Sequence, residues 1–301
     1  MKLKITTPAN FNFRSTLYSH GWCSLSPFEV SRDRKRLLRT ILSEDGKPFV
    51  VTIYEAHPGA LIIETDGAGK SDWTPYHKEL IAQATACLRL DEDLEEFYTE
   101  ARRHPQFRWI PKLGAGRLLR APEVFEDIIK MICTTNCSWA LTETMVRNLC
   151  ARLGTRVTET TYTFPTAEAI ADRTEQYLRK EIRAGYRAPY ILEFSRRVAR
   201  GESDPQQWRK TTAPTPDLFN EVRSIKGVGP YAAGNILKLL GRYDYLGVDS
   251  WCRKQFSGLH KNGRRVSDRT IERYYAPYGN WRGLFFWLDL TKHWYRTQYP
   301  F

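Results

Sequence analysis

The sequence predicts an α+β protein, in which a small N-terminal antiparallel sheet packs on a large, all-helical body. Near the start of the chain, two β-rich runs flank the turn His57-Pro-Gly59, a pattern typical of a β-hairpin. From about residue 74 onward, apolar residues recur at helical spacing. We therefore expect a sheet domain over residues 1–73 and a helical domain over residues 74–301.

The strands of the predicted sheet are short and rich in β-branched and aromatic residues. The hairpin strands are expected over Pro48–Ala56 and Ala60–Asp66, and Arg36–Leu42 can supply a further strand.

The helices of the predicted body follow from apolar spacing and from Ser, Thr, Gly and Pro at their ends. They are expected over Tyr76–Leu90, Pro122–Ile132, Trp139–Leu153, Thr166–Asp172, Glu175–Ile182, Ala188–Ala199, Asp217–Ser224, Tyr231–Leu240, Ser250–Phe256, Ser267–Tyr275 and Trp281–Tyr295.

Composition favours a polyanionic partner. The net charge is +12, and nine Trp and sixteen Tyr accompany the basic residues. A basic surface with aromatic side chains suits nucleic acid first and an anionic membrane second. Charge alone fits a soluble basic protein equally well, so the aromatic residues decide in favour of nucleic acid.

The six Cys do not form a metal-binding pattern. Cys133 and Cys137 are four residues apart and can share a helical face, but a zinc or iron–sulfur site needs more ligands than two. The N-terminus lacks the apolar core of a secretory signal, and no apolar run is long enough to span a membrane. We expect a cytoplasmic monomer with reduced thiols, associated with the nucleoid if the source is bacterial.

A glycine-rich turn between two predicted helices is the most informative segment. It reads Ile225-Lys-Gly-Val-Gly-Pro-Tyr231, and Pro230 occupies the first turn of the next helix, where its missing amide costs little. The glycines allow a phosphate to approach the main chain, and Gly227, Gly229 and Tyr231 can donate their amides to it. By itself, this pattern is more often an ordinary tight turn.

The carboxylate that follows makes phosphate binding the better interpretation. Leu246-Gly-Val-Asp249 ends a short apolar stretch, and Ser250 can cap the next helix. Asp249 alone could be another helix cap. Together with the turn, it predicts a catalytic group about one helix away from a phosphate-binding hairpin.

These two segments resemble the helix-hairpin-helix (HhH-GPD) DNA glycosylase superfamily, with residues 223–236 as the hairpin and Asp249 as the family's aspartate. The likeness is strongest to the 8-oxoguanine and 3-methyladenine branches and covers most of residues 10–295. Further similar segments are Ser19–Trp22, Ile132–Asn136, Gly185–Tyr190 and Pro277–Leu290.

The resemblance implies a cleft between helical subdomains and a double-stranded DNA partner that contains a damaged base. It implies that the carbonyls of Arg223, Ile225 and Val228 bind a monovalent cation, Na⁺ or K⁺, next to a DNA phosphate. Asn136 matches the residue that enters the duplex. The four-Cys tail of the iron–sulfur branches is absent, so no such cluster is expected, and the chemistry needs no cofactor.

Two departures from the family pattern refine the predicted chemistry. Bifunctional members carry a Schiff-base Lys where this chain has Tyr231, and a phenol cannot form an imine. We therefore predict a monofunctional glycosylase that uses water. The Gln that reads 8-oxoguanine aligns with Gly283. The Arg that reads the opposing cytosine aligns with Leu141, and the loss of this Arg predicts weak opposite-base selectivity.

The predicted base pocket is aromatic. Trp22 and Trp287 are preferred as its walls because they lie in pocket-like segments, and His20 can hydrogen-bond a base edge. The other candidate walls are Trp139, Trp251 and Trp281, although core packing is the commoner role of a Trp.

The predicted reaction extrudes a base and hydrolyses its glycosidic bond, and Asp249 stabilises the oxocarbenium-like sugar and orients the attacking water. The leading substrate is an alkylated purine of the 3-methyladenine or 7-methylguanine type. Tyr231, Gly283 and the aromatic residues point to it, because a cationic base leaves readily and binds aromatic faces. The alternatives are an oxidised or deaminated purine, such as 8-oxoguanine or hypoxanthine, and a non-catalytic DNA-binding protein.

Overall fold

The computed structural model describes residues 2–65, 74–296 and 299. They form two compact units, the first built from residues 2–65, 74–92 and 117–205 and the second from residues 93–116, 206–296 and 299. The predicted domain boundary at residue 73 borders residues 66–73, which lie outside the described residues. That boundary follows the change from strands to helices and stays a prediction.

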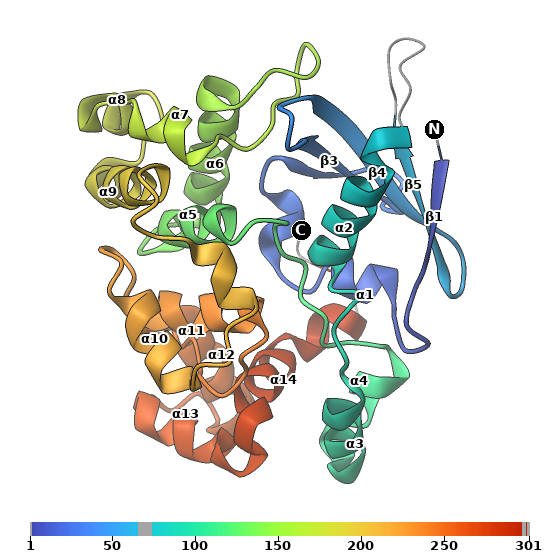
Figure 1. Cartoon of the computed structure of the whole chain (residues 1–301). Coiled ribbons are helices and arrows are strands. Elements are labelled where there is room, and N and C mark those ends of the chain that lie inside the picture. Colours follow the sequence, from blue (N-terminus) through green and yellow to red (C-terminus); the bar gives the residue numbers. More distant parts are fainter. Residues whose placement is uncertain (1, 66–73, 297–298, 300–301) are drawn as a thin grey trace. The chain divides into compact units, whose positions relative to one another are not determined.

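The first unit contains the sheet that the sequence predicts. Five antiparallel strands lie in the order β1-β5-β4-β3-β2 (Figure 1). Their bounds are β1 Lys2–Thr6, β2 Phe28–Val30, β3 Arg36–Leu42, β4 Pro48–His57 and β5 Ala60–Thr65. The predicted β4–β5 hairpin and the predicted strand β3 are confirmed; the predicted last residue of β5, Asp66, lies outside the described residues.

Alternating burial explains how the sheet faces its core. On β4, Phe49, Val51 and Ile53 are buried and their neighbours are not, as expected when one face of a strand packs against the interior. Helix α2 (His77–Leu88) packs against β1 and β5 and covers part of that face (Figure 1).

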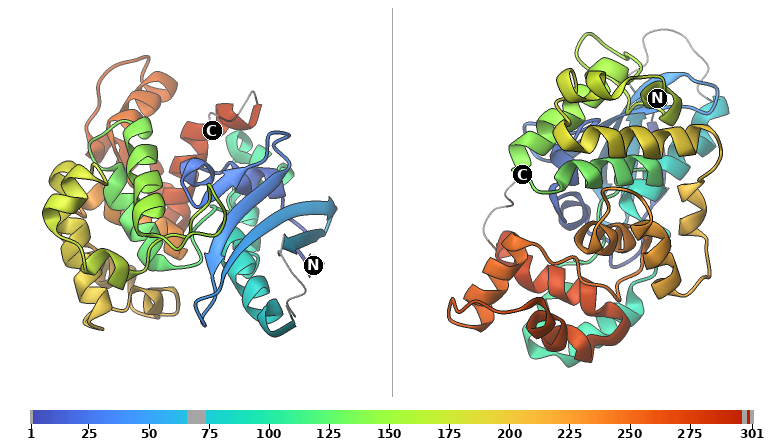
Figure 2. Two further views of the ribbon diagram at one scale, coloured as in Figure 1. Left: turned by 90° about the horizontal axis from the view of Figure 1, so that it is seen from above. Right: turned by 90° about the vertical axis from the view of Figure 1, so that its left-hand side faces the viewer.

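Helices α5 to α9 of the first unit pack together, apart from the short helix α1 (Figure 1, Figure 2). Helix α9 contacts α5, α7 and α8, and α5 contacts α6. Their bounds are α1 Phe13–Leu17, α5 Val124–Thr134, α6 Trp139–Leu153, α7 Ala167–Ala171, α8 Glu175–Lys180 and α9 Ala188–Ala199.

The second unit is helical and has an aromatic interior. Phe97, Phe107 and Phe285 pack together with ring centroids 4.8–4.9 Å apart, and Tyr278 and Trp281 join them. The helices are α3 Glu95–Arg103, α4 Trp109–Lys112, α10 Thr215–Arg223, α11 Pro230–Leu240, α12 Ser250–His260, α13 Asp268–Tyr275 and α14 Arg282–Arg296. Short 3₁₀ turns in the two units are Gly21–Ser24, Thr74–Tyr76, Pro105–Phe107, Gly185–Arg187, Pro205–Arg209 and Ala276–Trp281.

Local capping explains why the starts of α6, α7, α8 and α13 were predicted to within one residue, whereas the helix predicted to end at Phe256 continues to His260. The side chains of Ser138, Thr166, Thr174 and Ser267 each accept a hydrogen bond from an amide in the first turn of α6, α7, α8 and α13. Gly241 ends α11 in the left-handed region, at φ 90°. No helix among the described residues is both long and apolar enough to cross a membrane.

Helix α5 is buried on its polar side as well as its apolar side. The carboxylate of Glu126 accepts hydrogen bonds from Arg39 Nη1 at 3.0 Å and Nη2 at 2.5 Å, and lies 2.7 Å from Lys130 Nζ. All three side chains are at most 6% exposed. Burial tends to raise the pKa of Glu126, but the charges of Arg39 and Lys130 lower it below its usual range. The carboxylate therefore stays ionised and ties β3 to α5.

We expect Glu126→Gln to lower the free energy of unfolding by about 3–5 kcal/mol, because two buried cations lose their shared counter-charge. Urea unfolding at neutral pH measures the loss. Glu168→Gln, at an exposed position of α7, is the control and should change stability by less than about 0.5 kcal/mol. An equal change in both variants would contradict the assignment.

Candidate active site

The hairpin of the second unit forms between α10 and α11. Gly227 has φ +86°, a conformation that side-chain-bearing residues resist, and Val228 N donates to Ile225 O at 3.0 Å to close the turn. Ile225 and Val228 are buried and anchor the turn in the interior. Gly229 then starts α11 as its N-cap, with Pro230 in the first turn.

The predicted anion-binding amides of the hairpin are those of Gly227 and Gly229. Within the described residues, no hydrogen bond engages the amides of Gly227 and Gly229. Gly229 is exposed, and a Cβ built there would meet nothing within 4 Å. An anion can therefore reach these amides and the N-terminus of α11 directly.

The predicted cation ligands lie in the same turn. The carbonyl of Ile225 already accepts the turn hydrogen bond from Val228, and a carbonyl oxygen retains a second lone pair. Arg223 is the last residue of α10, where helical carbonyls lack intrahelical partners. These backbone oxygens are the donor type that a hard cation prefers, and their cation-binding role stays a prediction.

Asp249 is the N-cap of α12. Its Oδ1 accepts a hydrogen bond from Cys252 N at 2.7 Å, and the side chain is half-buried. The capping bond uses Oδ1, and the Cys252 thiol also interacts with this carboxylate. The prediction that Ser250 caps this helix is wrong: Ser250 is its first residue and is exposed. The aspartate is thus both a cap and a candidate catalytic group.

A buried lysine lies near this carboxylate. Lys238 is on α11 and is 3% exposed, and its Nζ is 4.9 Å from the centroid of the Trp287 ring. Burial lowers the pKa of Lys238 to about 8, against the opposing attraction of Cys252 and Asp249. Lys238 lies two turns after Tyr231, too far along α11 to occupy the position of the family's Schiff-base lysine. Lys238 follows Tyr231 by seven residues, a spacing that places both on one face of a helix. This spacing was the signal in the sequence that Lys238 could belong to the site.

Three tryptophans gather beside Lys238. Trp251 at the start of α12 lies 6.0 Å from Trp287 and 5.7 Å from Trp294 between ring centroids, and Trp287 lies 5.6 Å from Trp294. Trp251 and Trp287 are half-buried and Trp294 is buried. The two predicted wall residues among them, Trp251 and Trp287, therefore belong to one aromatic cluster. The third, Trp294, was not singled out.

Gly283 has a packing reason for being glycine. A Cβ at this position would lie 2.3 Å from the carbonyl oxygen of Tyr245 and 2.6 Å from that of Tyr243. Gly283 N also donates to Tyr243 O at 2.6 Å. The backbone contact excludes any side chain here. The absence of a Gln at this position is therefore explained by packing, and it does not show which base the pocket accepts.

The predicted wedge residue lies in the first unit. Asn136 is exposed with φ +47°, and its Nδ2 donates to the hydroxyl of Tyr186 at 3.3 Å. The Tyr186 hydroxyl donates to the carbonyl of Thr135 at 3.2 Å, and Arg187 donates to the same carbonyl through Nε at 3.1 Å. Tyr186 and Arg187 hold this loop, and sequence reasoning noted their segment without assigning them a role.

The other first-unit pocket candidates are anchored by hydrogen bonds. Trp22 is 3% exposed, and its Nε1 donates to Asp127 Oδ1 at 2.8 Å, so it is a core side chain. His20 Nε2 lies 2.6 Å from the carbonyl of Leu119, and Trp139 Nε1 donates to Ser24 at 3.0 Å. These three candidates belong to the first unit; Gly283 and Trp287 belong to the second.

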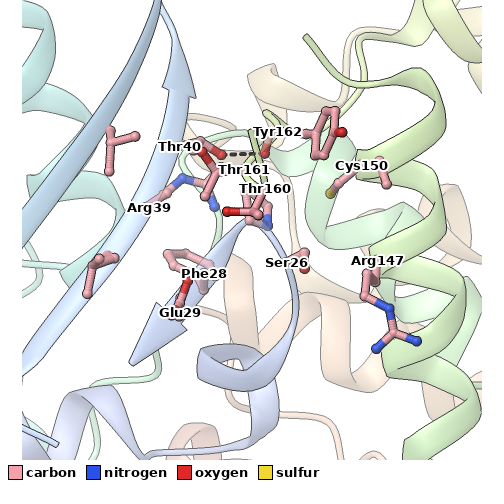
Figure 3. Close-up of a pocket in the computed structure, with 14 residues that line it drawn as sticks. Ser26, Phe28, Glu29, Arg39, Thr40, Arg147, Cys150, Thr160, Thr161 and Tyr162 are labelled. Atoms are coloured by element: carbon pink, nitrogen blue, oxygen red, sulfur yellow. Dashed lines mark hydrogen bonds between the residues drawn. The ribbon is translucent and has the colours of Figure 1, made fainter. Parts of the chain in front are cut away.

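A separate pocket of about 230 Å³ lies in the first unit between β2, β3 and α6 (Figure 3). The Thr40 hydroxyl donates to the carbonyl of Tyr162 at its rim, and Arg39 and Cys150 contribute to its wall. Burial raises the pKa of Cys150 to about 12, so this thiol is unreactive at neutral pH. None of the predicted site residues line this pocket.

Comparison with known families matches part of the chain to one family. Residues 129–277 match the family model described as HhH-GPD superfamily base excision DNA repair protein. This range includes the Ile225–Gly229 hairpin and Asp249. Residues 129–277, about half of the chain, therefore match the HhH-GPD superfamily that the sequence predicts.

Two relatives are similar in sequence. The N-glycosylase/DNA lyase of Saccharomyces cerevisiae is 27% identical over 165 residues, 48% of this chain and 42% of the relative. The probable N-glycosylase/DNA lyase of Methanothermobacter thermautotrophicus is 30% identical over 203 residues, 60% of this chain and 63% of the relative. The chain thus matches less than two thirds of the length of either relative.

Solved structures confirm the predicted fold class. The 3-methyladenine DNA glycosylase of Archaeoglobus fulgidus superposes with a TM-score of 0.75 and 21% identity, covering 97% of this chain and 99% of that one. The apo 8-oxoguanine glycosylase/lyase of Clostridium acetobutylicum gives a TM-score of 0.74 and 19% identity, with 96% and 95% coverage.

The buried Lys238 makes a prediction about stability and pH. We expect Lys238→Met to be the more stable protein below pH 8, where the wild type must bury an ammonium ion. Between pH 8 and the unfolded pKa near 10.5, the native amine deprotonates first, so the wild type gains up to about 3 kcal/mol relative to the variant. Urea unfolding of both proteins across pH 7–11 gives the difference; a difference independent of pH would show that Lys238 is solvated.

Proposed function

We propose that this protein is a base-excision DNA glycosylase that removes a damaged purine from double-stranded DNA. The observation that carries the proposal is the presence, in one unit, of open hairpin amides just before α11 and of the half-buried carboxylate of Asp249 at the start of α12. The amides suit a DNA phosphate, and the carboxylate suits the sugar cation that forms when a base leaves. The names of the similar proteins, which include N-glycosylase and 8-oxoguanine and 3-methyladenine glycosylases, support the same reaction class.

Asp249 is proposed to act as a carboxylate. The oxocarbenium-like sugar carries positive charge, and an ionised oxygen close to it stabilises the transition state. The capping bond from Cys252 fixes the orientation of the side chain, so that the carboxylate can accept a proton from the attacking water. The base leaves first from an extruded nucleotide.

The proposed glycosylase is monofunctional. A lyase forms an imine between a lysine and C1′ of the sugar, and the first turn of α11 presents Tyr231 rather than an amine. The product is then an intact strand with an abasic site. The lyase names of the two relatives make this the part of the proposal that needs its own test.

Two classes of lesion are candidates. An alkylated, cationic purine is favoured by Tyr231 and the aromatic set; Gly283, which also pointed to it, has a packing explanation. An oxidised or deaminated, neutral purine is favoured by the ammonium group of Lys238 beside Trp287. The proposed wedge is Asn136, held by Tyr186.

The proposal needs no cofactor for chemistry. A monovalent cation at the carbonyls of Arg223, Ile225 and Val228 would bridge the hairpin to a phosphate. We further propose that the protein acts as a cytoplasmic monomer.

We expect Asp249→Asn to abolish base release while leaving stability within about 0.5 kcal/mol, because Asn caps a helix as well as Asp does but carries no charge. Asp249→Ala should lose both release and about 1 kcal/mol of stability. Release is measured on duplexes that each carry one lesion, followed by hot alkali, with urea unfolding alongside. Full activity in Asp249→Asn would remove Asp249 from the mechanism. Binding to a lesion duplex without release by the wild type would identify a non-catalytic DNA-binding protein.

We expect no covalent adduct when the wild type is treated with borohydride during reaction with a lesion duplex, because Tyr231 cannot form an imine. The strand should stay uncut until alkali is added. Tyr231→Lys is the positive control, since it restores an amine at this position. An adduct in the wild type that Lys238→Met removes would overturn the hydrolytic assignment and identify Lys238 as the nucleophile.

A further inference from the structure

We propose that Lys238 is a specificity-determining residue that makes the site select an electrically neutral damaged purine over a cationic one. This inference rests on the proposed function and decides between its two lesion classes. It uses contacts within the second unit only.

Lys238 lies on the same face of α11 as Tyr231, the residue that follows the hairpin. Tyr231, Asn235 and Lys238 are spaced at i, i+4 and i+7, which places them on one face of the helix. The first two are half-buried, and Lys238 is buried. Asn235 Nδ2 donates to the carbonyl of Tyr231 at 2.9 Å, and its side chain packs against Gly247, where any Cβ would clash with it. This face therefore runs from the hairpin to the segment that bears Asp249.

The ammonium group of Lys238 binds the face of Trp287. Its Nζ lies 4.9 Å from the ring centroid, within the range of a cation–π contact, and desolvation strengthens such a contact. Trp251 and Trp294 pack against the same indole. The negative face of this ring is thus already used by a cation of the protein itself.

A second cation is disfavoured at an aromatic wall of this kind. A cationic purine stacked on Trp287 would meet the positive charge of Lys238 across the ring, in surroundings where charges are poorly screened. The single negative charge of Asp249 is already balanced by the positive charge of Lys238 before a substrate binds. It therefore does not offset the additional charge of a cationic base. A neutral purine stacks on the ring without this repulsion, so Lys238 does not weaken its binding.

The test compares the release of cationic and neutral bases. The probes are duplexes with a single 7-methylguanine, which is cationic, or a single hypoxanthine or 8-oxoguanine, which are neutral. We expect Lys238→Met, which keeps the length of the side chain, to raise the ratio of kcat/KM for 7-methylguanine to that of the faster neutral base by about tenfold. Lys238→Arg retains the charge and should keep the wild-type ratio.

Lys130→Met is the matched control, because Lys130 is also buried but lies in the first unit, paired with Glu126. It should leave the ratio unchanged, and thermal unfolding of each variant confirms that it is folded. Equal loss of both activities in Lys238→Met, or a ratio that does not rise, overturns the inference while the proposed function stands. A wild type that releases no base from any probe overturns both, and this result is distinct because no ratio can then be formed.

Discussion

Helix α5 is surrounded by the rest of the first unit, and its charged side chains can be buried only because each has a partner. Glu126 binds Arg39 of β3, and Asp127 binds the indole of Trp22 and the amide of Ala121. A carboxylate without such partners would be too costly to bury. The same helix ends at Thr134, directly before the loop that presents Asn136. The contacts that hold α5 in the unit therefore also fix where the proposed wedge begins.

In the second unit, the candidate site is built mainly from backbone groups. The hairpin depends on Gly227 and Gly229, on the buried side chains of Ile225 and Val228, and on α11, which begins immediately after Gly229. Asp249 needs only the start of α12. Both arrangements are local, so a short stretch of sequence specifies them. This explains why residues 225–231 and Asp249 were predictable, together with the ends of α6, α9 and β3, which depend on caps, spacing and strand propensity along the chain.

Contacts between distant residues were not predictable in the same way. β1 has no turn linking it to its partner β5, and β2 is only three residues long, so neither strand carries a local signal. Trp22 reads as a pocket wall until its hydrogen bond to Asp127, 105 residues away, shows that it is core. From the sequence, Gly283 is interpreted as the loss of a base-reading side chain. In the structure, the carbonyls of Tyr243 and Tyr245 leave no room for any side chain at this position. In each case the sequence identifies the residue type, and a non-local partner decides its role.

Lys238 illustrates how such a partner changes the chemistry of a residue. In the sequence it is a lysine two turns too late to be a nucleophile. In the structure it is a buried amine against Trp287, in a unit where Asp249 supplies the opposing charge. Burial of an ammonium ion weakens the native state, and the indole face and the carboxylate offset only part of that cost, since the pKa of Lys238 stays below its usual value. On the proposed function, the same contacts give the site a fixed positive charge before DNA binds. In this proposal the two groups have separate tasks: the carboxylate of Asp249 directs water to the sugar, and the amine of Lys238 acts on the charge of the base.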